Sequence, residues 1–548
     1  GDKIQSKMIA EAANISTIPG SNIAVRDPEE AKKIANEIGY PVMLKASSGG
    51  GGKGMRLAWN DQECREGLTR AISEAKASFG DDRVFIEKFI ENPRHIEIQI
   101  VADQHGNIVY LAERECSIQR RHQKVIEEAP STFLDEITRR AMGEQAVRLA
   151  KAVNYQSVGT VEFVLDKNKN FYFLEMNTRL QVEHPVTEAI TGYDLVELMI
   201  KIAAGENIPF KQKDIKVTGW AIESRIYAED PARNFLPSTG RLVNYKCPEE
   251  NPRIRVDAGV REGDEISIYY DPMIAKLITK GKDRDEAIRL MSSALDSYFI
   301  RGVRHNVDFL SALVSHPRFN SGDLTTNFIE EEFPDGFRPQ DLPARDPFVA
   351  IVVAASVNFA FQKRATSQLD PILLHNQSVS NDWVVVTKDG NHTVKVHQTP
   401  DRYLVALPEE RFELITKWQV GDPLLHGTLN EEVICVQVER NEISFCITHR
   451  GSQDNVLVLT KRHAELNTLM PQKKPNDTSK ALVSPMPGLL LSLEVQAGQE
   501  VKAGEALAVI EAMKMENVLR AERDVVISKI NALVGESLMV DQVIMEFG

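Results

Sequence analysis

The sequence predicts a multidomain chain that combines an α/β and α+β body with two smaller β-rich domains. Helical and strand patterns alternate over residues 1–335, which is typical of such a body. After residue 335, one apolar helix is followed by short strands with turn signals, which predicts a small β-barrel or sandwich. An internal repeat predicts a small symmetric β-sandwich in the last segment. A length of 548 residues fits three or more domains, because one hydrophobic core seldom grows that large.

The apolar patterns place the elements of the body in order. We predict a helix over 2–13 with Asp2 as its N-cap, strands over 41–46, 94–102, 159–165 and 171–176, and a helix over 285–297. The polar segment 166–170 separates two of these strands, so we expect a β-hairpin there.

The middle of the chain has a different pattern. An apolar helix is predicted over 347–364, and strands over 383–387, 393–397, 403–406, 411–415, 432–439, 442–448 and 455–459. Residues 336–470 are therefore expected to form one domain, and the polar segment 471–480 a flexible linker.

The segment 481–548 carries the repeat. Gly498, Val501, Gly504 and Leu507 are matched at the same spacing by Gly535, Leu538, Asp541 and Ile544. The segment 511–517 lies between the two copies, and its centre is predicted to be a tight hairpin turn that exposes Lys514 to solvent.

The composition excludes several classes of protein. Lys plus Arg number 65 and Asp plus Glu number 79, a formal net charge of −14, so we expect neither nucleic acid nor an anionic membrane as a partner. The 5 cysteines are scattered without a CxxC motif, which argues against a disulfide framework or a structural zinc site and favours a reducing compartment. The longest apolar run, 348–361, is shorter than a membrane span and is predicted to be a buried helix.

A glycine run follows the strand at 41–46. Gly49, Gly51 and Gly54 satisfy G-x-G-x-x-G, but a strand over 55–59 is expected where the dinucleotide fingerprint needs a helix. Met55 also stands where a P-loop needs Lys. We therefore expect a Gly-rich hairpin between two strands, either a surface loop or a cover whose backbone N–H groups approach a triphosphate.

Basic residues are concentrated around this loop in an otherwise acidic chain. Any one of them alone would be an ordinary surface charge, but together they predict a local pocket for a polyanion. They are Lys3, Lys45, Lys88, His95, Arg120, Arg121, His122 and Lys124.

The stretch 171–185 gives the strongest indication of chemistry. If it stays extended, alternation places acid, amide, Arg, amide and acid on one face, namely Glu175, Asn177, Arg179, Gln181 and Glu183. Glu162 is expected near Glu175 across the hairpin. Two close carboxylates repel unless a proton or cation separates them, and with Asn177 they form an oxygen site suited to Mg²⁺. An exposed strand of mixed charge is the alternative.

These motifs resemble those of the biotin carboxylases, an ATP-grasp family. The matching segments are 1–3, 49–55, 94–97, 115–121 and 175–185, and the segment 511–516 is similar to the biotin attachment site of carboxyl carrier domains. The resemblance covers 1–335 and 481–548 closely. It implies an ATP-grasp body, a biotinyl carrier domain, and between them a domain that docks the chain onto a carboxyltransferase.

The resemblance also implies a role for each matched residue. ATP would be held by Lys3, Lys45, Gly51, Gly52, Glu87, Lys88, His95, His122 and Lys124, and Mg²⁺ (or Mn²⁺) by Glu162, Glu175 and Asn177. Bicarbonate would bind Lys124, Arg179, Gln181 and Val182, with Glu183 as its base; Arg179 and Arg225 would assist catalysis, with Arg225 stabilising the biotin enolate, and Lys514 would carry biotin.

Three interpretations of function compete. The first is the α subunit of a biotin-dependent acyl-CoA carboxylase, which a biotin protein ligase modifies and which binds a carboxyltransferase β subunit. Segments 268–279 and 300–303 are most similar to propionyl-CoA carboxylase α chains. Methylcrotonyl-CoA and acetyl-CoA carboxylases are the alternatives. The second is a self-contained enzyme such as pyruvate carboxylase, disfavoured because 335–480 is too short for a barrel-sized transferase. The third is a non-catalytic carrier or scaffold, or a lipoyl carrier.

Two expectations concern features beyond the sequence. Gly1 is no natural start, and biotin carboxylases carry a further nucleotide-fold lobe before the segment that matches 1–3, so we expect an upstream segment. The resemblance implies a cytoplasmic protein in a bacterium or a mitochondrial matrix protein in a eukaryote.

Overall fold

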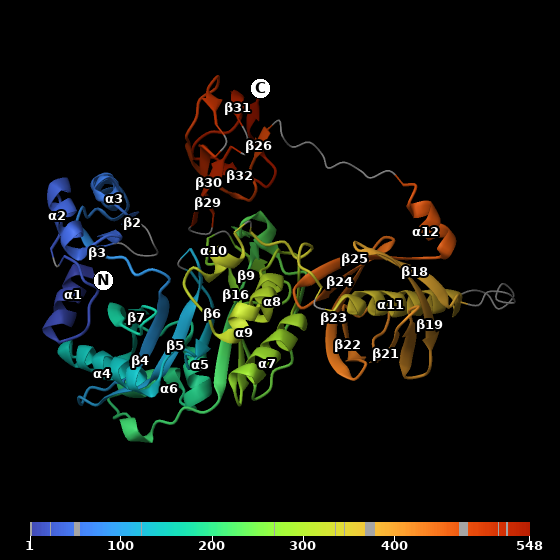
Figure 1. Ribbon diagram of the computed structural model, residues 1–548, viewed down its shortest axis with the longest axis horizontal. Coiled ribbons are helices and arrows are strands. Elements are labelled where there is room, and N and C mark those ends of the chain that lie inside the picture. The colour runs from blue at the N-terminus through green and yellow to red at the C-terminus, as the bar shows by residue number, and fades with distance from the viewer. Residues whose placement is uncertain are drawn as a thin grey trace.

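A computed structural model describes residues 3–21, 23–48, 55–121, 123–267, 269–334, 336–344, 346–367, 379–470, 481–502, 504–512, 515–521 and 524–548. Figure 1 shows a mixed α/β body, a β-barrel that surrounds one long helix, and a small β-domain that contains the C-terminus. The three types of architecture expected from the sequence are therefore present.

A small antiparallel sheet of order β2-β1-β3 opens the body. Its elements are α1 (Lys3–Ala12), α2 (Pro28–Ile38), β1 (Val42–Ala46), β2 (Met55–Ala58), α3 (Asp61–Phe79) and β3 (Val84–Lys88). Asp27 and Asn60 cap α2 and α3 by accepting backbone N–H bonds, the usual role of short polar residues at these positions. A strand follows the glycine run, as predicted, so the G-x-G-x-x-G motif lacks the helix that dinucleotide binding requires.

An eight-stranded sheet forms the centre of the body, in the order β14-β16-β9-β6-β5-β4-β7-β8. Its strands are β4 (Arg94–Ala102), β5 (Ile108–Arg120), β6 (Gln123–Ala129), β7 (Ser157–Leu165), β8 (Phe171–Asn177), β9 (Trp220–Tyr227), β14 (Ile254–Ala258) and β16 (Met273–Gly281). The predicted hairpin is confirmed, because β7 pairs with β8 and Glu162 lies opposite Glu175.

Helices cover both faces of this sheet. α4 (Glu136–Ala152) packs with Ile96, Ile98 and Ile100, and α6 (Leu195–Ala203) packs with Val101 and Val158. These residues belong to opposite faces, because side chains alternate along a strand. α5 (His184–Thr191) contacts the central strands β5, β6, β9 and β16.

The rest of the body packs against β9 and β16 in a large apolar cluster. Its helices are α7 (Arg284–Asp296), α8 (Val307–Ser315), α9 (Pro317–Ser321) and α10 (Phe328–Glu332). Short elements connect them: 3₁₀ turns at Gln212–Asp214 and Pro231–Arg233, and strands β10 (Glu229–Asp230), β11 (Leu236–Pro237), β12 (Gly240–Arg241), β13 (Asn244–Lys246), β15 (Glu265–Ile266) and β17 (Phe299–Arg301).

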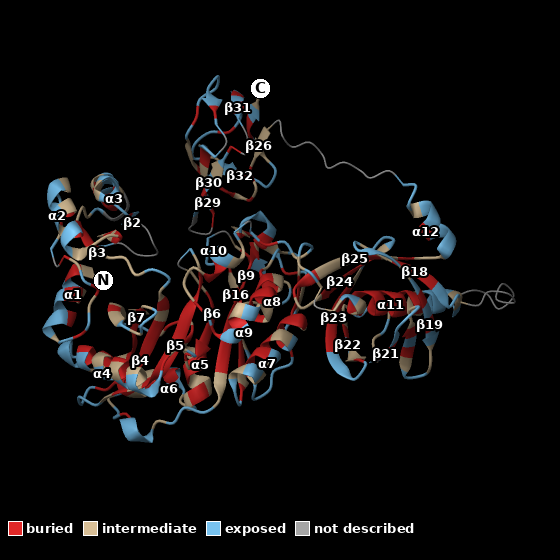
Figure 2. Cartoon of the chain, in the orientation of Figure 1, coloured by how far each residue is buried: buried red, intermediate tan, exposed pale blue. Residues whose placement is uncertain are grey.

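A closed eight-stranded antiparallel barrel surrounds helix α11 (Pro347–Ser367). Its strands are β18 (Asp382–Thr387), β19 (Gly390–Gln398), β20 (Arg402–Ala406), β21 (Arg411–Thr416), β22 (Leu424–Leu429), β23 (Glu432–Asn441), β24 (Ser444–His449) and β25 (Ser452–Leu459), followed by α12 (Lys461–Asn467). The sequence missed β22, because His426, Gly427 and Thr428 interrupt its apolar pattern. Among the described helices, α11 alone is long and apolar enough to cross a membrane, but most of it is buried inside the structure, as Figure 2 shows.

The C-terminal domain is a β-sandwich of two four-stranded sheets, β26-β33-β31-β28 and β30-β29-β27-β32. Its strands are β26 (Ala481–Val483), β27 (Gly488–Leu493), β28 (Glu500–Val501), β29 (Ala506–Ala512), β30 (Met515–Arg520), β31 (Val525–Ile530), β32 (Ser537–Leu538) and β33 (Val543–Phe547). The repeat extends to the backbone, because Gly504 and its partner Asp541 both have positive φ. β29 pairs with β30 as a hairpin around 513–514, whereas Lys514 itself lies outside the described residues.

Candidate active site

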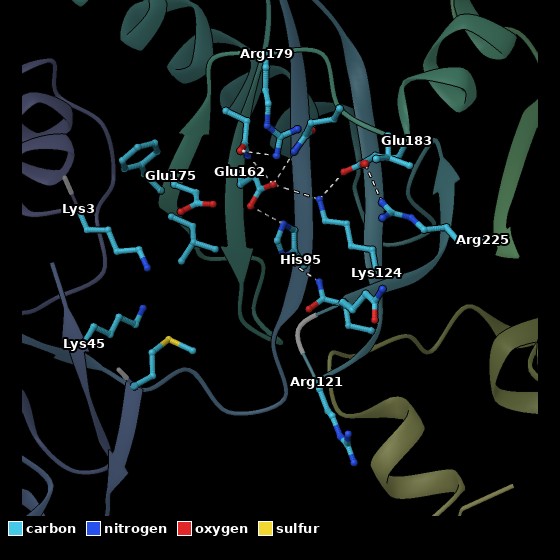
Figure 3. Close-up of a pocket in the computed structure, with 18 of the residues that line it drawn as sticks. Lys3, Lys45, His95, Arg121, Lys124, Glu162, Glu175, Arg179, Glu183 and Arg225 are labelled. Carbon is cyan, nitrogen blue, oxygen red and sulfur yellow. Dashed lines mark hydrogen bonds and ion pairs between the residues drawn. The ribbon is translucent and has the colours of Figure 1, made fainter. Parts of the chain in front are cut away.

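A cavity of about 810 Å³ lies between the small N-terminal sheet and the eight-stranded sheet. Figure 3 shows Lys3 and Lys45 on one side and Lys124, Glu183 and Arg225 on the other. Its lining is strongly charged and includes Lys3, Lys7, Lys45, Glu87, His95, Gln119, Arg121, Lys124, Glu162, Glu175, Asn177, Arg179, Gln181, Val182, Glu183 and Arg225. The structure thus brings together residues far apart in the sequence.

Three lysines of the N-terminal part mark one side of the cavity. Lys45 Nζ lies 2.9 Å from Glu87 Oε2, and Lys7 Nζ lies 3.1 Å from the other oxygen of Glu87. Burial, and also the charge of Lys45, lowers the pKa of Lys3, against the attraction of Glu175 and Glu87. A bound polyanion would favour the charged form of Lys3, so this side suits phosphate groups.

Oxygen ligands gather where β7 meets β8. Glu162 Oε1 accepts hydrogen bonds from Asn177 Nδ2 at 2.9 Å and Gln181 Nε2 at 2.8 Å, and Glu162 Oε2 lies 3.2 Å from His95 Nε2. Burial alone would raise the pKa of Glu162, but His95 and Lys124 hold it well below its usual value. The ionised Glu162, Glu175 opposite it and the Asn177 amide form a hard-oxygen set that fits Mg²⁺.

Glu183 lies between two cations immediately before α5. One of its carboxylate oxygens is 2.6 Å from Lys124 Nζ, and the other is 2.9 Å from an Arg225 NH₂ nitrogen. Lys124 also contacts Glu97 at 2.6 Å and Glu162 at 3.2 Å, so it joins the base region to the oxygen ligands. Glu183 is only 2% exposed, which leaves its carboxylate directed to these partners and to the cavity.

The expectation that 171–185 stays extended is wrong beyond Asn177. β8 is the last strand of its sheet and ends there, and α5 begins at His184. Between them the chain turns inward, because the fully buried Arg114 holds Gln181 Oε1 at 2.8 Å. Arg114 also donates to Glu97, Gln99, Thr160 and Thr187. The turn, rather than strand alternation, brings Glu183 to Lys124 and Arg225.

Several predicted residues lie elsewhere than expected. Lys88 points away from the cavity lining, since its Nζ donates to the carbonyls of Gly39 and Tyr40, both at 2.8 Å. Arg120 pairs with Glu229 at 2.7 Å, because alternation along β5 turns it away from the face of Gln119. Val182 does line the cavity, but its carbonyl is turned to Lys276, whose Nζ donates to it at 2.8 Å. Gly51, Gly52 and His122 lie outside the described residues.

Sequence reasoning gave no role to three buried or cavity-lining residues, namely Lys7, Glu97 and Arg114. Their sequence context indicated only that Lys7 belongs to a helix and Arg114 to a strand. One pattern in the sequence does point to them: the polar residues Glu97 and Gln99 lie within the otherwise apolar strand 94–102. A charge buried in such a strand requires a charged partner elsewhere in the fold.

Family models cover most of the chain. Residues 2–211 match the ATP-binding domain of carbamoyl-phosphate synthase L chain, and 223–331 match the biotin carboxylase C-terminal domain. Residues 351–473 match the propionyl-coenzyme A carboxylase BT domain, and 480–547 match the biotin-requiring enzyme model.

Solved structures similar to the chain are biotin carboxylases. The biotin carboxylase domain of Hydrogenobacter thermophilus 2-oxoglutarate carboxylase, in complex with MgADP, ADP and bicarbonate, is 47% identical with a TM-score of 0.59, over 61% of this chain and 73% of that one. A Campylobacter jejuni biotin carboxylase in complex with β-γ-ATP is 45% identical with a TM-score of 0.59, over 60% of this chain and 73% of that one.

Curated relatives distinguish between the acyl-CoA carboxylases. The chain is 54% identical to the propionyl-CoA carboxylase alpha chain of Ruegeria pomeroyi, over 100% of this chain and 83% of the relative. It is 49% identical to the human mitochondrial propionyl-CoA carboxylase alpha chain (98% and 75%), but 40% identical to a rat methylcrotonoyl-CoA carboxylase alpha subunit (97% and 75%). The chain belongs to the family of propionyl-CoA carboxylase α chains, the biotin carboxylase and biotin carrier component of that enzyme.

Proposed function

We propose that this chain uses ATP and bicarbonate to carboxylate a biotin attached to Lys514, and that a separate carboxyltransferase β subunit then carboxylates propionyl-CoA. The observation that carries the proposal is Glu183, a buried carboxylate in the cavity wall between Lys124 and Arg225. Bicarbonate needs a base as it attacks the γ-phosphate, and a carboxylate flanked by two cations is placed to provide one beside an anionic substrate.

The N-terminal side of the cavity is assigned to ATP. Lys3 and Lys45 neutralise its phosphates, with Glu87 orienting Lys45 at 2.9 Å. We assign Gly51, Gly52, His95, His122 and Lys124 to the same nucleotide. Glu162, Glu175 and Asn177 would hold Mg²⁺ (or Mn²⁺), which supplies charge neutralisation at the transferred phosphoryl group.

The other side is assigned to bicarbonate and its activation. Lys124, Arg179, Gln181 and the Val182 backbone bind the anion, and Glu183 removes its proton as the bicarbonate oxygen forms a bond to the γ-phosphorus and the bond to ADP breaks. The products are carboxyphosphate and ADP, and the proton stays on Glu183. Lys124 is within 3.2 Å of both Glu183 and Glu162, so one ammonium serves the base and the oxygen ligands.

Arg225 completes this side. It lines the cavity with a permanent positive charge, which suits an acceptor oxygen that becomes more negative during the reaction. Carboxyphosphate breaks down to CO₂ and phosphate. Biotin attached to Lys514 would supply the ureido nitrogen that bonds to this CO₂, with the proton of that nitrogen passing to the phosphate. Every step assigned to this chain is therefore phosphate binding, proton removal or stabilisation of negative charge.

The activity is tested by ATP cleavage that depends on bicarbonate and by carboxylation of free biotin. Both should be present in the purified full-length protein with Mg²⁺. ATP cleavage that does not depend on bicarbonate would contradict the proposal, and the absence of any ATP cleavage would favour the non-catalytic carrier interpretation.

Attachment at Lys514 is tested by intact mass after coexpression with a biotin protein ligase. The wild type and the matched control Lys502→Arg should both carry the biotin mass increment, and Lys514→Arg should lack it. Lys502 is a suitable control because it is an exposed lysine of the same domain, ion-paired with Asp524 at 2.8 Å. Biotin on the Lys514→Arg protein would place the attachment site at another lysine.

The partner and the compartment follow from the family. A complex with a β subunit should carboxylate propionyl-CoA faster than methylcrotonyl-CoA or acetyl-CoA, and the opposite order would reassign the substrate. One of the relatives is a bacterial protein, and another is a mitochondrial protein. We infer the cytoplasm for a bacterial source and the mitochondrial matrix for a eukaryotic one.

A further inference from the structure

Two buried carboxyl groups lie behind Arg225, outside the roles assigned above. Glu127 of β6 and Glu223 of β9 are directly opposite each other in the antiparallel register. Both are 0% exposed. Directly opposite side chains in such a pair have Cβ atoms only about 5 Å apart, so the two carboxyl groups are neighbours.

If both groups were ionised, most of their carboxylate oxygens would lack a hydrogen-bond donor. Glu127 Oε1 accepts a bond of 2.6 Å from Arg225 Nε. Among the described residues, Glu127 Oε2 and both oxygens of Glu223 have no hydrogen-bond partner. A buried acceptor without a donor is costly, and one proton held between the two groups would provide the missing donor.

The cations nearby are already engaged. The charged or titratable groups that face the pair are Lys124 of β6, Arg225 and Tyr227 of β9, Lys276 of β16, Cys116 of β5, and Glu183 just before α5. Lys124 contacts Glu97 and Glu183, and Lys276 contacts Asp257 at 3.2 Å and the Val182 carbonyl at 2.8 Å. No described cation therefore forms an ion pair with Glu223.

The electrostatics agree with a shared proton. Burial raises the pKa of Glu127 to about 7, against the attraction of Arg225. Burial and the charge of Glu127 raise the pKa of Glu223 well above its usual value. Above about pH 7, where Glu127 is ionised while Glu223 keeps its proton, the two groups therefore carry one negative charge between them, as coupled carboxyl pairs do.

We propose that Glu127 and Glu223 hold one proton between them and position Arg225 for the biotin carboxylation step. This inference rests on the proposed function. Glu127 Oε1 contacts Nε of the guanidinium at 2.6 Å and one NH₂ nitrogen at 2.5 Å, and Glu183 contacts the same NH₂ nitrogen at 2.9 Å. When Glu183 takes up the bicarbonate proton, its pull on Arg225 falls, and the singly charged pair keeps the guanidinium ionised and oriented toward the cavity.

Loss of the shared proton would change this balance. A second buried negative charge would bind Arg225 more strongly from behind and repel any anion in the cavity. Biotin carboxylation should therefore decline on the alkaline side as the pair ionises, whereas ATP cleavage without biotin, which does not need Arg225 at an acceptor oxygen, should decline less.

The test is the pH profile of free-biotin carboxylation by the full-length protein. Glu223→Gln cannot ionise, and its amide N–H can still donate to Glu127, so the alkaline limb should move upward by about one pH unit or more. Glu127→Gln removes the charge behind Arg225 and should reduce biotin carboxylation roughly tenfold, with less than about threefold loss of biotin-independent ATP cleavage.

The matched control is Glu128→Gln, the adjacent residue of the same strand. Glu128 is equally buried, but its partners are Arg284 at 2.7 Å and Trp220 at 2.9 Å on the other face of the sheet. The alkaline limb of the pH profile of Glu128→Gln should superimpose on that of the wild type. A second readout is the infrared difference spectrum between the wild type and Glu223→Gln at about pH 8, in which one protonated carboxyl component should be present in the wild type and missing from the variant, whatever its activity.

Two results would overturn the inference: an alkaline limb of Glu223→Gln that superimposes on the wild-type limb, or an unchanged carboxyl band. Failure of the proposed function looks different, because the wild type itself would then lack bicarbonate-dependent ATP cleavage and biotin carboxylation.

Discussion

The active-site face of the central sheet and the barrel around α11 are equally hidden from solvent but built from opposite materials. The sheet face buries Glu97, Arg114 and Glu183, which the half-buried Lys124 joins in one chain of ion pairs. The buried stretch of α11, from Val349 to Phe359, contains no charged residue and only two polar ones, Ser356 and Asn358. Figure 2 shows α11 and the central strands of the sheet mostly in red.

The difference teaches where each region is sensitive to substitution. A buried charge is tolerated only while its partner is present, so one change on the sheet face leaves an uncompensated ion. An apolar core loses only the contacts of the atoms removed. A single substitution should therefore cost much stability in the site region and little in the barrel.

Arg114→Met should give the largest loss of stability. The guanidinium is fully buried and is 2.5 Å from Glu97, and it also holds Gln181. Its removal leaves a buried carboxylate with only Lys124, at a cost of about 3–5 kcal/mol. Urea unfolding measures the change.

A companion variant makes that measurement specific. Arg114→Met combined with Glu97→Gln should recover part of the lost stability, because no unpaired ion then remains. A loss below about 1 kcal/mol for Arg114→Met alone would show that water replaces the guanidinium and would remove the contrast with the barrel.

Glu183→Gln should give the largest loss of activity. Bicarbonate-dependent ATP cleavage should fall by a factor of about 10² or more, because the amide cannot take up the proton. ATP binding, measured by calorimetry, should survive. The control is Glu188→Gln in the same helix, whose partner is Arg255 at 2.7 Å. Near-normal turnover of Glu183→Gln would assign the base to another residue.

The barrel was more predictable from the sequence than the site. The apolar composition of 347–364 and the turn signals after it were local features, and they predicted the helix and all but one of the strands. Which strand residues would meet was partly predictable too, because the hairpin at 166–170 fixed Glu162 opposite Glu175.

The path after Asn177 was not predictable by the same reasoning. It depends on Arg114, whose five partners come from four other segments of the body. The register between β6 and β9, which sets Glu127 opposite Glu223, likewise joins strands that are far apart in the sequence. The spacing of residues indicates which face of a strand or helix they share. Only the tertiary pairing of the strands decides which buried charges become neighbours.

Ile351→Val tests the barrel side of the comparison. Ile351 is 2% exposed within the apolar cluster, and loss of one methylene should cost about 0.5–1.5 kcal/mol. The unfolding transition of the barrel should shift while bicarbonate-dependent ATP cleavage stays at the wild-type level. A parallel loss of ATP cleavage would mean that the two regions unfold as one unit.

Ser356→Ala should have the smallest effect, and its sign distinguishes the two interiors. Ser356 is 1% exposed in the middle of α11, and among the described residues its hydroxyl has no hydrogen-bond partner. Removing an unpartnered buried hydroxyl relieves a desolvation cost, and alanine favours a helix more than serine does, so stability should stay level or rise by up to about 1 kcal/mol. On the sheet face, removal of one polar partner should always destabilise. A loss above about 1 kcal/mol in thermal unfolding of Ser356→Ala would show that the hydroxyl is bonded, for instance through a buried water, and that the barrel interior also depends on polar pairing.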